Sequence, residues 1–193
     1  MNIAVDIDDT LTDSFDYFQP FAAEFFGADL ESLKKRNISY SNLPAEWKSR
    51  ELDFFRAYYD NVVENTPFKP NAASAIKKLK SAGHRIIIIT GRTNDFYSDP
   101  YKTTEAELKN GAVVYDKLLC TLDKAEACRR EKIDVIIDDL PANLKATEES
   151  GAYPILFCGK GNQGVKCDYA KAFDWNDAVR IVFEYSKIKN NKY

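Results

Sequence analysis

The chain has 193 residues, of which 45% are hydrophobic and 30% charged, and its net charge is −3. This composition can build the core of one domain, or of one domain with a modest insertion, and it excludes an intrinsically disordered chain. The slight acidity and the absence of a long basic run argue against a nucleic-acid-binding surface, so we expect no nucleic-acid partner.

The sequence lacks the patterns of secreted and membrane proteins. The apolar run at the N-terminus stops at Asp6, which is too early for a signal peptide. No stretch approaches the roughly 18 apolar residues of a membrane span. We therefore expect a cytoplasmic protein without a membrane partner.

The first 70 residues combine one short strand with several helical segments. Residues 3–5 are an apolar run that ends in acidic residues, which predicts a buried strand. Hydrophobic spacing predicts helices at residues 15–26, 30–35 and 45–63, with a loop at 37–44 and a chain break at 66–70. We expect residues 15–70 to form a helical cap inserted into an α/β core made of residues 1–14 and 71–193.

From residue 71 onward, predicted strands and helices alternate. Residues 85–90 read RIIIIT, and consecutive isoleucines are typical of a central parallel strand. Further strands are predicted at residues 112–115, 133–137 and 153–157, and helices at 71–82, 104–109, 123–130, 143–150 and 174–185, with a frayed tail thereafter. The alternation predicts a doubly wound parallel sheet with helices on both faces.

Polar and acidic side chains follow three of these strands. They are Asp6, Asp8, Asp9 and Thr10 after the first strand, Thr90, Gly91 and Arg92 at the end of the isoleucine strand, and Asp138 and Asp139 after the strand at 133–137. In an open α/β sheet, ligands bind at the carboxyl ends of the strands. Carboxylates from separate strands suit Mg²⁺, which would offset their mutual repulsion. The pattern predicts a magnesium site at this edge.

Four sequence motifs, in order, resemble those of the haloacid dehalogenase superfamily phosphatases. VDIDDTLTDS has the DxDx(T/V) pattern of their first motif, IIIITGR is similar to the second, and VIIDD to the fourth. The third motif is a lysine at a helix start, for which Lys124 fits best and Lys117 is the weaker candidate. Response-regulator receiver domains use similar residues but place the paired acids first, so their order does not fit.

The resemblance implies a haloacid-dehalogenase-like α/β fold and a Mg²⁺-dependent phosphatase that acts through an aspartyl phosphate. It implies that Asp6 is the nucleophile and Asp8 the general acid and base, and we expect neighbouring carboxylates to raise the pKa of Asp8. Thr90, Gly91 and Lys124 would hold the transferring phosphoryl group. Mg²⁺ would be bound by Asp6, the backbone carbonyl of Asp8, and one or both of Asp138 and Asp139.

The motifs assign no role to two residues that lie beside them. Arg92 either contacts the substrate phosphate or pairs with an acid at the rim of the site, and the sequence leaves both open. Asp9 is expected to hold backbone geometry rather than to touch the substrate. The single histidine, His84, is expected at the surface, and the four cysteines, which match no zinc pattern, are expected to be reduced thiols.

The segment YDKLLCTLDKAEACRREKIDVIIDD, the VIIDDLP ending and the small cap resemble the 5′(3′)-deoxyribonucleotidase group. This implies that the small phosphorylated substrate is a nucleoside monophosphate. Phe15, Phe18 and Trp47 could supply an aromatic face for the base, and Ser41 or Asn42 polar contacts. A sugar phosphate or another small phosphomonoester remains an alternative, as do a mutase and a catalytically silent phosphate-binding regulatory module. The DxD motif disfavours a dehalogenase.

Overall fold

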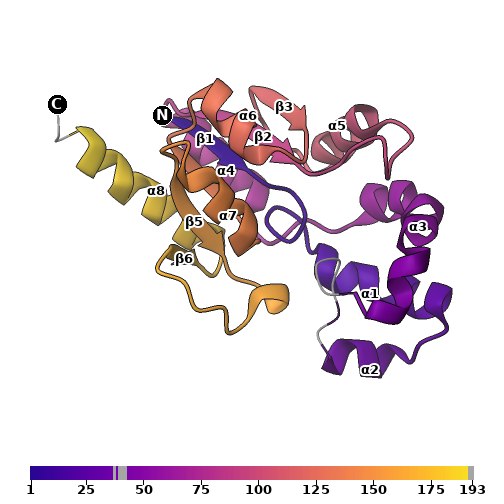
Figure 1. Cartoon of the computed structure of the whole chain (residues 1–193). Helices are drawn as coiled ribbons and strands as arrows, with labels where there is room; N and C mark the ends of the chain where they lie inside the picture. The colour runs from indigo at the N-terminus through magenta and orange to yellow at the C-terminus, as the bar shows by residue number, and fades with distance from the viewer. Residues whose placement is uncertain (37, 39–42, 191–193) are drawn as a thin grey trace.

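The structure is a computed structural model, and it describes residues 1–36, 38 and 43–190. Within these ranges, six parallel strands form one sheet in the order β3-β2-β1-β4-β5-β6 (Figure 1). The strands are β1 (Asn2–Val5), β2 (Arg85–Thr90), β3 (Lys117–Cys120), β4 (Val135–Asp138), β5 (Tyr153–Phe157) and β6 (Ala170–Ala172). The prediction of a parallel α/β sheet is confirmed.

Helices cover both faces of the sheet. They are α4 (Ala72–Ser81), α5 (Pro100–Asn110), α6 (Lys124–Glu131), α7 (Pro141–Glu148) and α8 (Trp175–Asn190), with a short 3-10 helix η3 (Lys160–Asn162) after β5. Ile86 and Ile88 pack in the core that includes α4 and α8, whereas Ile87 and Ile89 pack in the core that includes α6 and α7. Because neighbouring side chains of a strand point to opposite faces, the isoleucine run supplies both cores.

The chain between β1 and α4 forms a group of helices beside the sheet, seen at the right of Figure 1. These are α1 (Ser14–Phe26), α2 (Leu30–Lys35), the 3-10 helix η2 (Ala45–Arg50) and α3 (Glu51–Asn65). Their core is aromatic: Phe18 meets Phe54 edge to face, with ring centroids 5.2 Å apart. These helices occupy the segment predicted to be a cap, and the boundaries at residues 15 and 70 remain a prediction.

Two chain segments connect this helical group to the sheet, and they pair with each other. Thr12 and Phe68 form an antiparallel bridge. The N–H of Asp13 donates to the carbonyl of Pro67 at 2.8 Å, and the N–H of Lys69 donates to the carbonyl of Leu11 at 2.8 Å. The entry and exit of the helical group are therefore held side by side.

Several predicted boundaries are wrong, for local reasons. β3 begins at Lys117 rather than at residue 112, because Ala112 has a positive φ of 52° and Asp116 makes the first bonds to β2 through the backbone of Ile86. α8 continues to Asn190 instead of fraying after residue 185, and Lys189 forms an ion pair with Asp134. β6 was not predicted, since three residues are too few to show a periodic pattern.

Helix starts show which capping predictions hold. Asp123 and Asp174 accept backbone hydrogen bonds at 2.9 and 2.8 Å at the starts of α6 and α8, as expected of N-cap residues. Asn71 precedes α4 as predicted, but its side chain makes no cap bond, and its φ of 66° lies in the left-handed region. α5 starts at Pro100, earlier than predicted, behind the capping carboxylate of Asp99.

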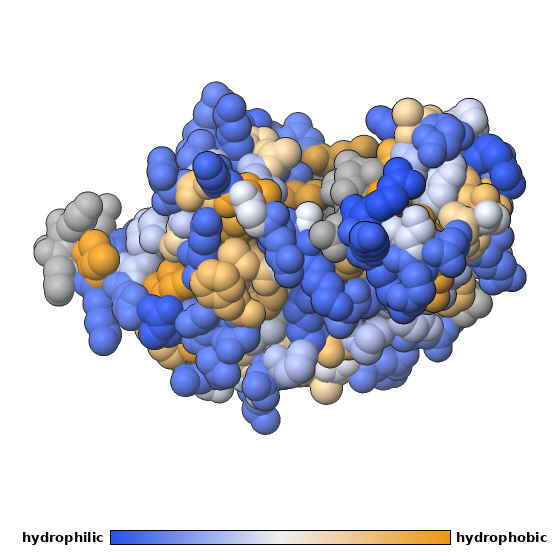
Figure 2. All heavy atoms as spheres, turned by 90° about the horizontal axis from the view of Figure 1, so that it is seen from below, coloured by the Kyte–Doolittle hydropathy of each residue, from blue (hydrophilic) through white to orange (hydrophobic). Residues whose placement is uncertain are grey.

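Four further findings concern the surface and the remaining polar residues. None of the described helices is long and apolar enough to cross a membrane. The face shown in Figure 2 is mostly hydrophilic, with small hydrophobic patches. His84 is buried rather than at the surface, with its Nδ1 3.4 Å from the N-terminal amine. The four cysteines are free thiols, as predicted.

Candidate functional site

The carboxyl edge of the sheet collects acidic side chains from two adjacent strands. Asp6 follows β1 and stays in register, because its N–H donates to the carbonyl of Ile137 in β4 at 3.0 Å. Asp138 ends β4, and Asp139 follows it. One carboxylate oxygen from each of Asp6, Asp138 and Asp139 lies within 4.8 Å of the others, and all three residues are buried. The two clusters expected from the sequence thus meet.

Lys124, the first residue of α6, reaches into this group. Its Nζ donates to Oδ1 of Asp6 and to Oδ2 of Asp138, both at 2.6 Å. Burial alone would lower the pKa of Lys124, but Asp138 and Asp6 outweigh it and hold that pKa above its ordinary value. Lys117, the other candidate, is the first residue of β3 and therefore lies at the edge of the sheet away from the acids, where it pairs with Glu131 at 2.7 Å. The structure therefore brings Lys124, and not Lys117, to the acids.

The two acids after β4 have different surroundings. Oδ1 of Asp138 accepts hydrogen bonds from the N–H of Leu140 at 2.9 Å and from Asn143 Nδ2 at 3.0 Å, in addition to the Lys124 contact at Oδ2. No described residue donates a hydrogen bond to the carboxylate of Asp139, which lines the cavity described below. Asp138 is thus held by protein donors, whereas Asp139 keeps its carboxylate available.

Burial and neighbouring charges raise the pKa values of two of these acids. Burial, opposed by Lys124 and reinforced by Asp138 and Asp8, raises the pKa of Asp6 to about 7. Burial, followed by the charges of Asp138, Asp6 and Asp9, raises the pKa of Asp139 well above its ordinary value. Three buried carboxylates face one ammonium group, so the site lacks positive charge.

Asp8 lies on the other side of Asp6 and pairs with Arg92. Arg92 Nη2 donates to Asp8 Oδ1 at 2.9 Å and Nε to Oδ2 at 3.2 Å, and Ser14 Oγ adds a bond at 3.0 Å. Burial would raise the pKa of Asp8, but Arg92 and Ser14 outweigh it and lower that pKa. The expectation of a raised pKa is wrong, because the sequence did not show that Arg92 would contact this carboxylate.

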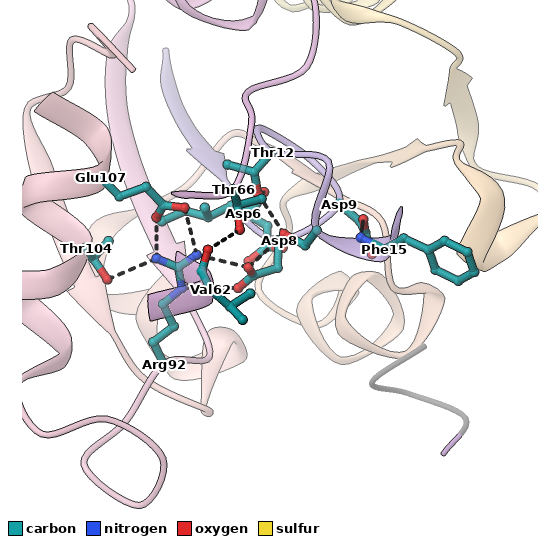
Figure 3. A network of polar contacts seen from close by, with 12 residues as sticks. Asp6, Asp8, Asp9, Thr12, Phe15, Val62, Thr66, Arg92, Thr104 and Glu107 are labelled. Atoms are coloured by element: carbon teal, nitrogen blue, oxygen red, sulfur yellow. Dashed lines mark hydrogen bonds and ion pairs between the residues drawn. The ribbon is translucent and has the colours of Figure 1, made fainter. Parts of the chain in front are cut away.

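Arg92 is almost fully buried, and its second edge faces α5. Nη1 and Nη2 both bond to the carboxylate of Glu107, the Nη2 contact at 3.3 Å, and Nη1 also lies 3.4 Å from Thr104 Oγ1 (Figure 3). Of the two roles left open for Arg92, the structure shows pairing with acids. A contact to substrate phosphate stays a prediction. Glu107 was missed, although Thr104 and Glu107 share one face of a helix at i and i+3.

Asp9 closes the turn between β1 and α1. It has a φ of 57°, and its carboxylate accepts the N–H of Phe15 at 2.5 Å. Burial raises the pKa of Asp9 to about 7, against the effects of the Phe15 N–H and Lys69. This carboxylate shapes the backbone that follows the DxD motif.

Thr90 and Gly91 end β2 beside the acids. The Oγ1 atoms of Thr90 and of Thr10 are buried and have no hydrogen-bond partner among the described groups. Buried hydroxyl groups normally have partners, so an orphaned hydroxyl at a site edge suits a ligand oxygen. Gly91 lines the cavity, whereas Thr90 is fully buried and is not among the lining residues. Phosphate binding by both remains a prediction.

A cavity of about 330 Å³ opens above the acidic cluster, within the range of small-molecule sites. It is lined by Asp6, Asp8, Asp9, Glu51, Phe55, Gly91, Arg92, Phe96, Tyr97, Leu122, Lys124, Asp139, Leu140, Asn143 and Gly161. Phe55 of α3 and Phe96 of the loop after β2 meet edge to face, with centroids 5.3 Å apart. The cavity thus has a charged floor and an aromatic wall.

The aromatic residues expected to face a substrate lie elsewhere. Phe18 packs against Phe54, and Trp47 stacks on Phe26 with centroids 4.2 Å apart, so both belong to the core of the helical group. Phe15 borders an adjoining hollow of about 290 Å³ rather than this cavity. For Phe18 and Trp47 the prediction of an aromatic face is wrong, because helical spacing does not show which buried face is a cleft. For Phe15 it stays a prediction, since its hollow shares Asp9 and Asp139 with the cavity. Residues 41 and 42, predicted as polar contacts, lie outside the described residues.

The donor set fits a hard divalent cation. Mg²⁺ prefers carboxylate, carbonyl and water oxygens, and the acidic cluster offers carboxylates from the ends of two strands. The carboxylate of Asp139 has no described donor, and burial first, with the charges of the neighbouring acids second, raises the pKa values of Asp6 and Asp139. A cation bound at Asp6 and Asp139 would offset those charges.

Comparison with known proteins gives matches in structure only. No protein-family model and no curated protein sequence matches the chain. Similar solved structures include a protein described as a predicted phosphatase from Clostridium acetobutylicum, with a TM-score of 0.68, 17% identity and coverage of 95% of this chain and 98% of that one. A haloacid dehalogenase-like hydrolase from Streptococcus pneumoniae has a TM-score of 0.64 and 17% identity, over 94% of this chain and 97% of that one.

Another similar structure is the D,D-heptose 1,7-bisphosphate phosphatase from Burkholderia thailandensis, with a TM-score of 0.58 and 14% identity, over 94% of this chain and 97% of that one. Each match covers nearly the whole of both chains, at identities at which likeness shows the fold alone. The order of the six parallel strands and these matches lead to one conclusion. The chain has the α/β fold of the haloacid dehalogenase-like hydrolases.

Proposed function

We propose that the protein is a Mg²⁺-dependent phosphomonoester hydrolase with Asp6 as its nucleophile. The observation that carries the proposal is the bridge from Lys124 Nζ to Asp6 and Asp138, beside the carboxylate of Asp139. A carboxylate nucleophile that attacks a phosphate dianion needs fixed positive charge. Lys124 supplies part of that charge from a buried helix start.

The chemistry assigned to the residues has two steps. In the first, an oxygen of Asp6 bonds to phosphorus while the ester P–O bond breaks, and protonated Asp8 gives its proton to the leaving oxygen. In the second, Asp8 takes a proton from water, whose oxygen attacks phosphorus and releases Asp6 and inorganic phosphate. Arg92 lowers the pKa of Asp8, which favours the ionised form that the second step requires, so the first step must hold the proton on Asp8 against this effect.

The residues that would hold the cation are Asp6, Asp139 and the backbone carbonyl of Asp8. When bound, Mg²⁺ would supply positive charge that offsets the repulsion between the acids and the phosphoryl oxygens. Asp138 would act through Lys124, because its carboxylate is engaged by Lys124, Asn143 and the Leu140 N–H. Thr90 and Gly91 would bind the phosphoryl oxygens.

The substrate that we propose is a nucleoside monophosphate. Its support is the wall of Phe55, Phe96 and Tyr97 above the charged floor, because a nucleobase stacks favourably on aromatic side chains. The discriminating measurement is kcat/KM on dUMP, dTMP, AMP and several sugar phosphates. A sugar phosphate that exceeds every nucleotide by about tenfold, or about 1.4 kcal/mol of transition-state preference, would overturn the nucleotidase assignment alone.

The hydrolase proposal is tested with p-nitrophenyl phosphate and Mg²⁺. We expect the wild type to release phosphate, and Asp6→Asn to lose turnover by orders of magnitude while its circular dichroism spectrum stays unchanged. If Asp6→Asn kept more than about a tenth of kcat, covalent catalysis at Asp6 would be wrong. No release by the wild type above a metal-free control would favour a silent phosphate-binding module instead.

A further inference from the structure

The hydrogen bonds of Arg92 leave none of its donors unused. A guanidinium group has five N–H donors. Arg92 directs two of them to Asp8, two to Glu107 and one to Thr104, and its side chain is 2% exposed. Each edge of the planar guanidinium group forms two hydrogen bonds to one carboxylate. The position of the Glu107 carboxylate therefore fixes the plane of the guanidinium group, and with it the orientation of the Asp8 carboxylate.

Glu107 is the fixed end of this arrangement. Its side chain is 1% exposed and lies on α5, where the neighbouring Leu108 packs into the sheet core. Asp8 is the other end: its side chain is 32% exposed, and it lines the cavity. The buried Glu107 therefore constrains Arg92, and Arg92 in turn constrains the Asp8 carboxylate that lines the cavity.

We infer that Glu107 is a positioning residue. By bonding the second edge of the Arg92 guanidinium group, it orients Asp8 for proton transfer. The inference rests on the proposed function, because it assigns a purpose to Asp8 as the acid that protonates the leaving oxygen. Glu107 touches neither the cavity nor the acidic cluster, so any effect it has on the reaction travels through Arg92. Without Glu107, Arg92 would keep its charge and its bonds to Asp8 and Thr104, but would lose the second pair of bonds that fixes its plane.

Leaving-group dependence separates this role from simple structural support. An alkyl phosphate releases a strongly basic alkoxide unless Asp8 protonates it, whereas p-nitrophenolate leaves with little help. The ratio kcat/KM includes all steps up to departure of the alcohol, so it reports this proton transfer. A variant with a misplaced Asp8 loses more on an alkyl phosphate than on an aryl phosphate, and a variant that is merely less stable loses equally on both.

The test compares Glu107→Gln with the wild type on p-nitrophenyl phosphate and on an alkyl phosphate that the wild type hydrolyses, both with Mg²⁺. General acids contribute about 10²- to 10⁴-fold, so partial loss of positioning should lower the alkyl-to-aryl ratio of kcat/KM about tenfold. Glu105→Gln, an exposed change of the same charge on the same helix, is the control and should keep the wild-type ratio.

A second variant covers the case in which Glu107→Gln does not fold. Glu107→Asp keeps the charge but is one methylene shorter, so it should lower the ratio less than Glu107→Gln. A wild-type ratio in folded Glu107→Gln, or in Glu107→Asp where the first variant fails to fold, overturns the positioning role and leaves the hydrolase proposal intact. A wild type without phosphatase activity overturns both the positioning role and the hydrolase proposal.

Discussion

Lys124 donates a 2.6 Å hydrogen bond to Asp6, a residue 118 positions earlier in the chain. The contact joins the start of α6 to the end of β1, and the same ammonium group also bonds Asp138. The spacing between the two residues in sequence carries no sign of it. It exists because β1 and β4 are neighbours in the sheet and α6 immediately precedes β4.

Replacement of Lys124 should affect catalysis and stability together. Lys124→Met keeps much of the volume but leaves Asp6 and Asp138 without their shared cation, and breaking a buried ion pair costs about 3–5 kcal/mol. Loss of a fixed charge at the reacting group should also lower kcat at least about 10²-fold. Urea unfolding and phosphate release would measure both effects.

Lys117→Met is the matched control for that experiment. Lys117 is 41% exposed and pairs with Glu131, away from the acidic cluster. Glu131 is buried but keeps Arg85 and Arg130 as partners when Lys117 is replaced, so the loss of stability should be about 1 kcal/mol or less and kcat should be unchanged. Equal losses of kcat in the two variants would mean that the charge of Lys124 has no special part in the reaction.

The two neighbouring acids should respond differently to metal. Preferential binding of Mg²⁺ to the folded state raises the free energy of unfolding by about 2.7 kcal/mol at 100 times Kd. We expect Asp139→Asn to lose the Mg²⁺-induced rise in Tm, and Asp138→Asn to keep it with a lower starting Tm. The reason is that Asp138 is engaged by Lys124 and Asn143, while Asp139 has no described donor.

Without metal, we expect Asp139→Asn to stabilise the protein. Its folded-state pKa is raised, so its ionisation opposes folding, and the penalty grows as pH rises above the unfolded value of about 4. At pH 8 in EDTA, Asp139→Asn should therefore raise Tm. Tm values of wild type, Asp138→Asn and Asp139→Asn, each with EDTA and with Mg²⁺, test this pattern. The same Mg²⁺ response in all three proteins would place the cation elsewhere.

Asp116 should make stability depend on pH at a site remote from the acids. Burial would raise its pKa, but Lys80 and the backbone N–H of Ile86 outweigh it and lower that pKa. The stabilisation is present above the unfolded pKa of about 4 and is lost as pH falls through the folded pKa. Asp116→Asn should cost about 1 kcal/mol at pH 7, because the carboxylate is partly exposed.

Urea unfolding at pH 7 and near pH 3 measures this difference. We expect the free energies of unfolding of wild type and Asp116→Asn to converge at the lower pH. A constant gap between them at both pH values would show that the charge of Asp116 is not the origin of the effect.

Gly111 should tolerate no side chain. A Cβ added there would lie 2.2 Å from Cε2 of Phe68, so the ring, in the segment that leads out of the helical group, would have to move. Overpacking of this kind costs about 1–3 kcal/mol, and Gly111→Ala should lower Tm accordingly. Gly159→Ala is the control, since its added Cβ meets no atom within 4 Å. Equal Tm values for Gly111→Ala and wild type would show that Phe68 repacks without cost.

Local patterns in the sequence were enough to predict the sheet and its acidic edge. Four isoleucines in β2 predict a strand buried on both faces, and the acids after β1 and β4 predict where charge gathers, because both signals are local in the chain. Short or weakly patterned elements could not be predicted from the sequence. β6 has only three residues, and the start of β3 depends on the contact between Asp116 and Ile86.

Which side chains share the site depends on the packing of the folded chain. Lys124 rather than Lys117 reaches Asp6, Arg92 is committed to Asp8 and Glu107, and Phe55 and Phe96 rather than Phe18 and Trp47 line the cavity. Each choice depends on how helices and loops pack against a sheet whose strand order differs from chain order. Hydrophobic periodicity shows that a face is buried, but not whether a core or a cleft buries it.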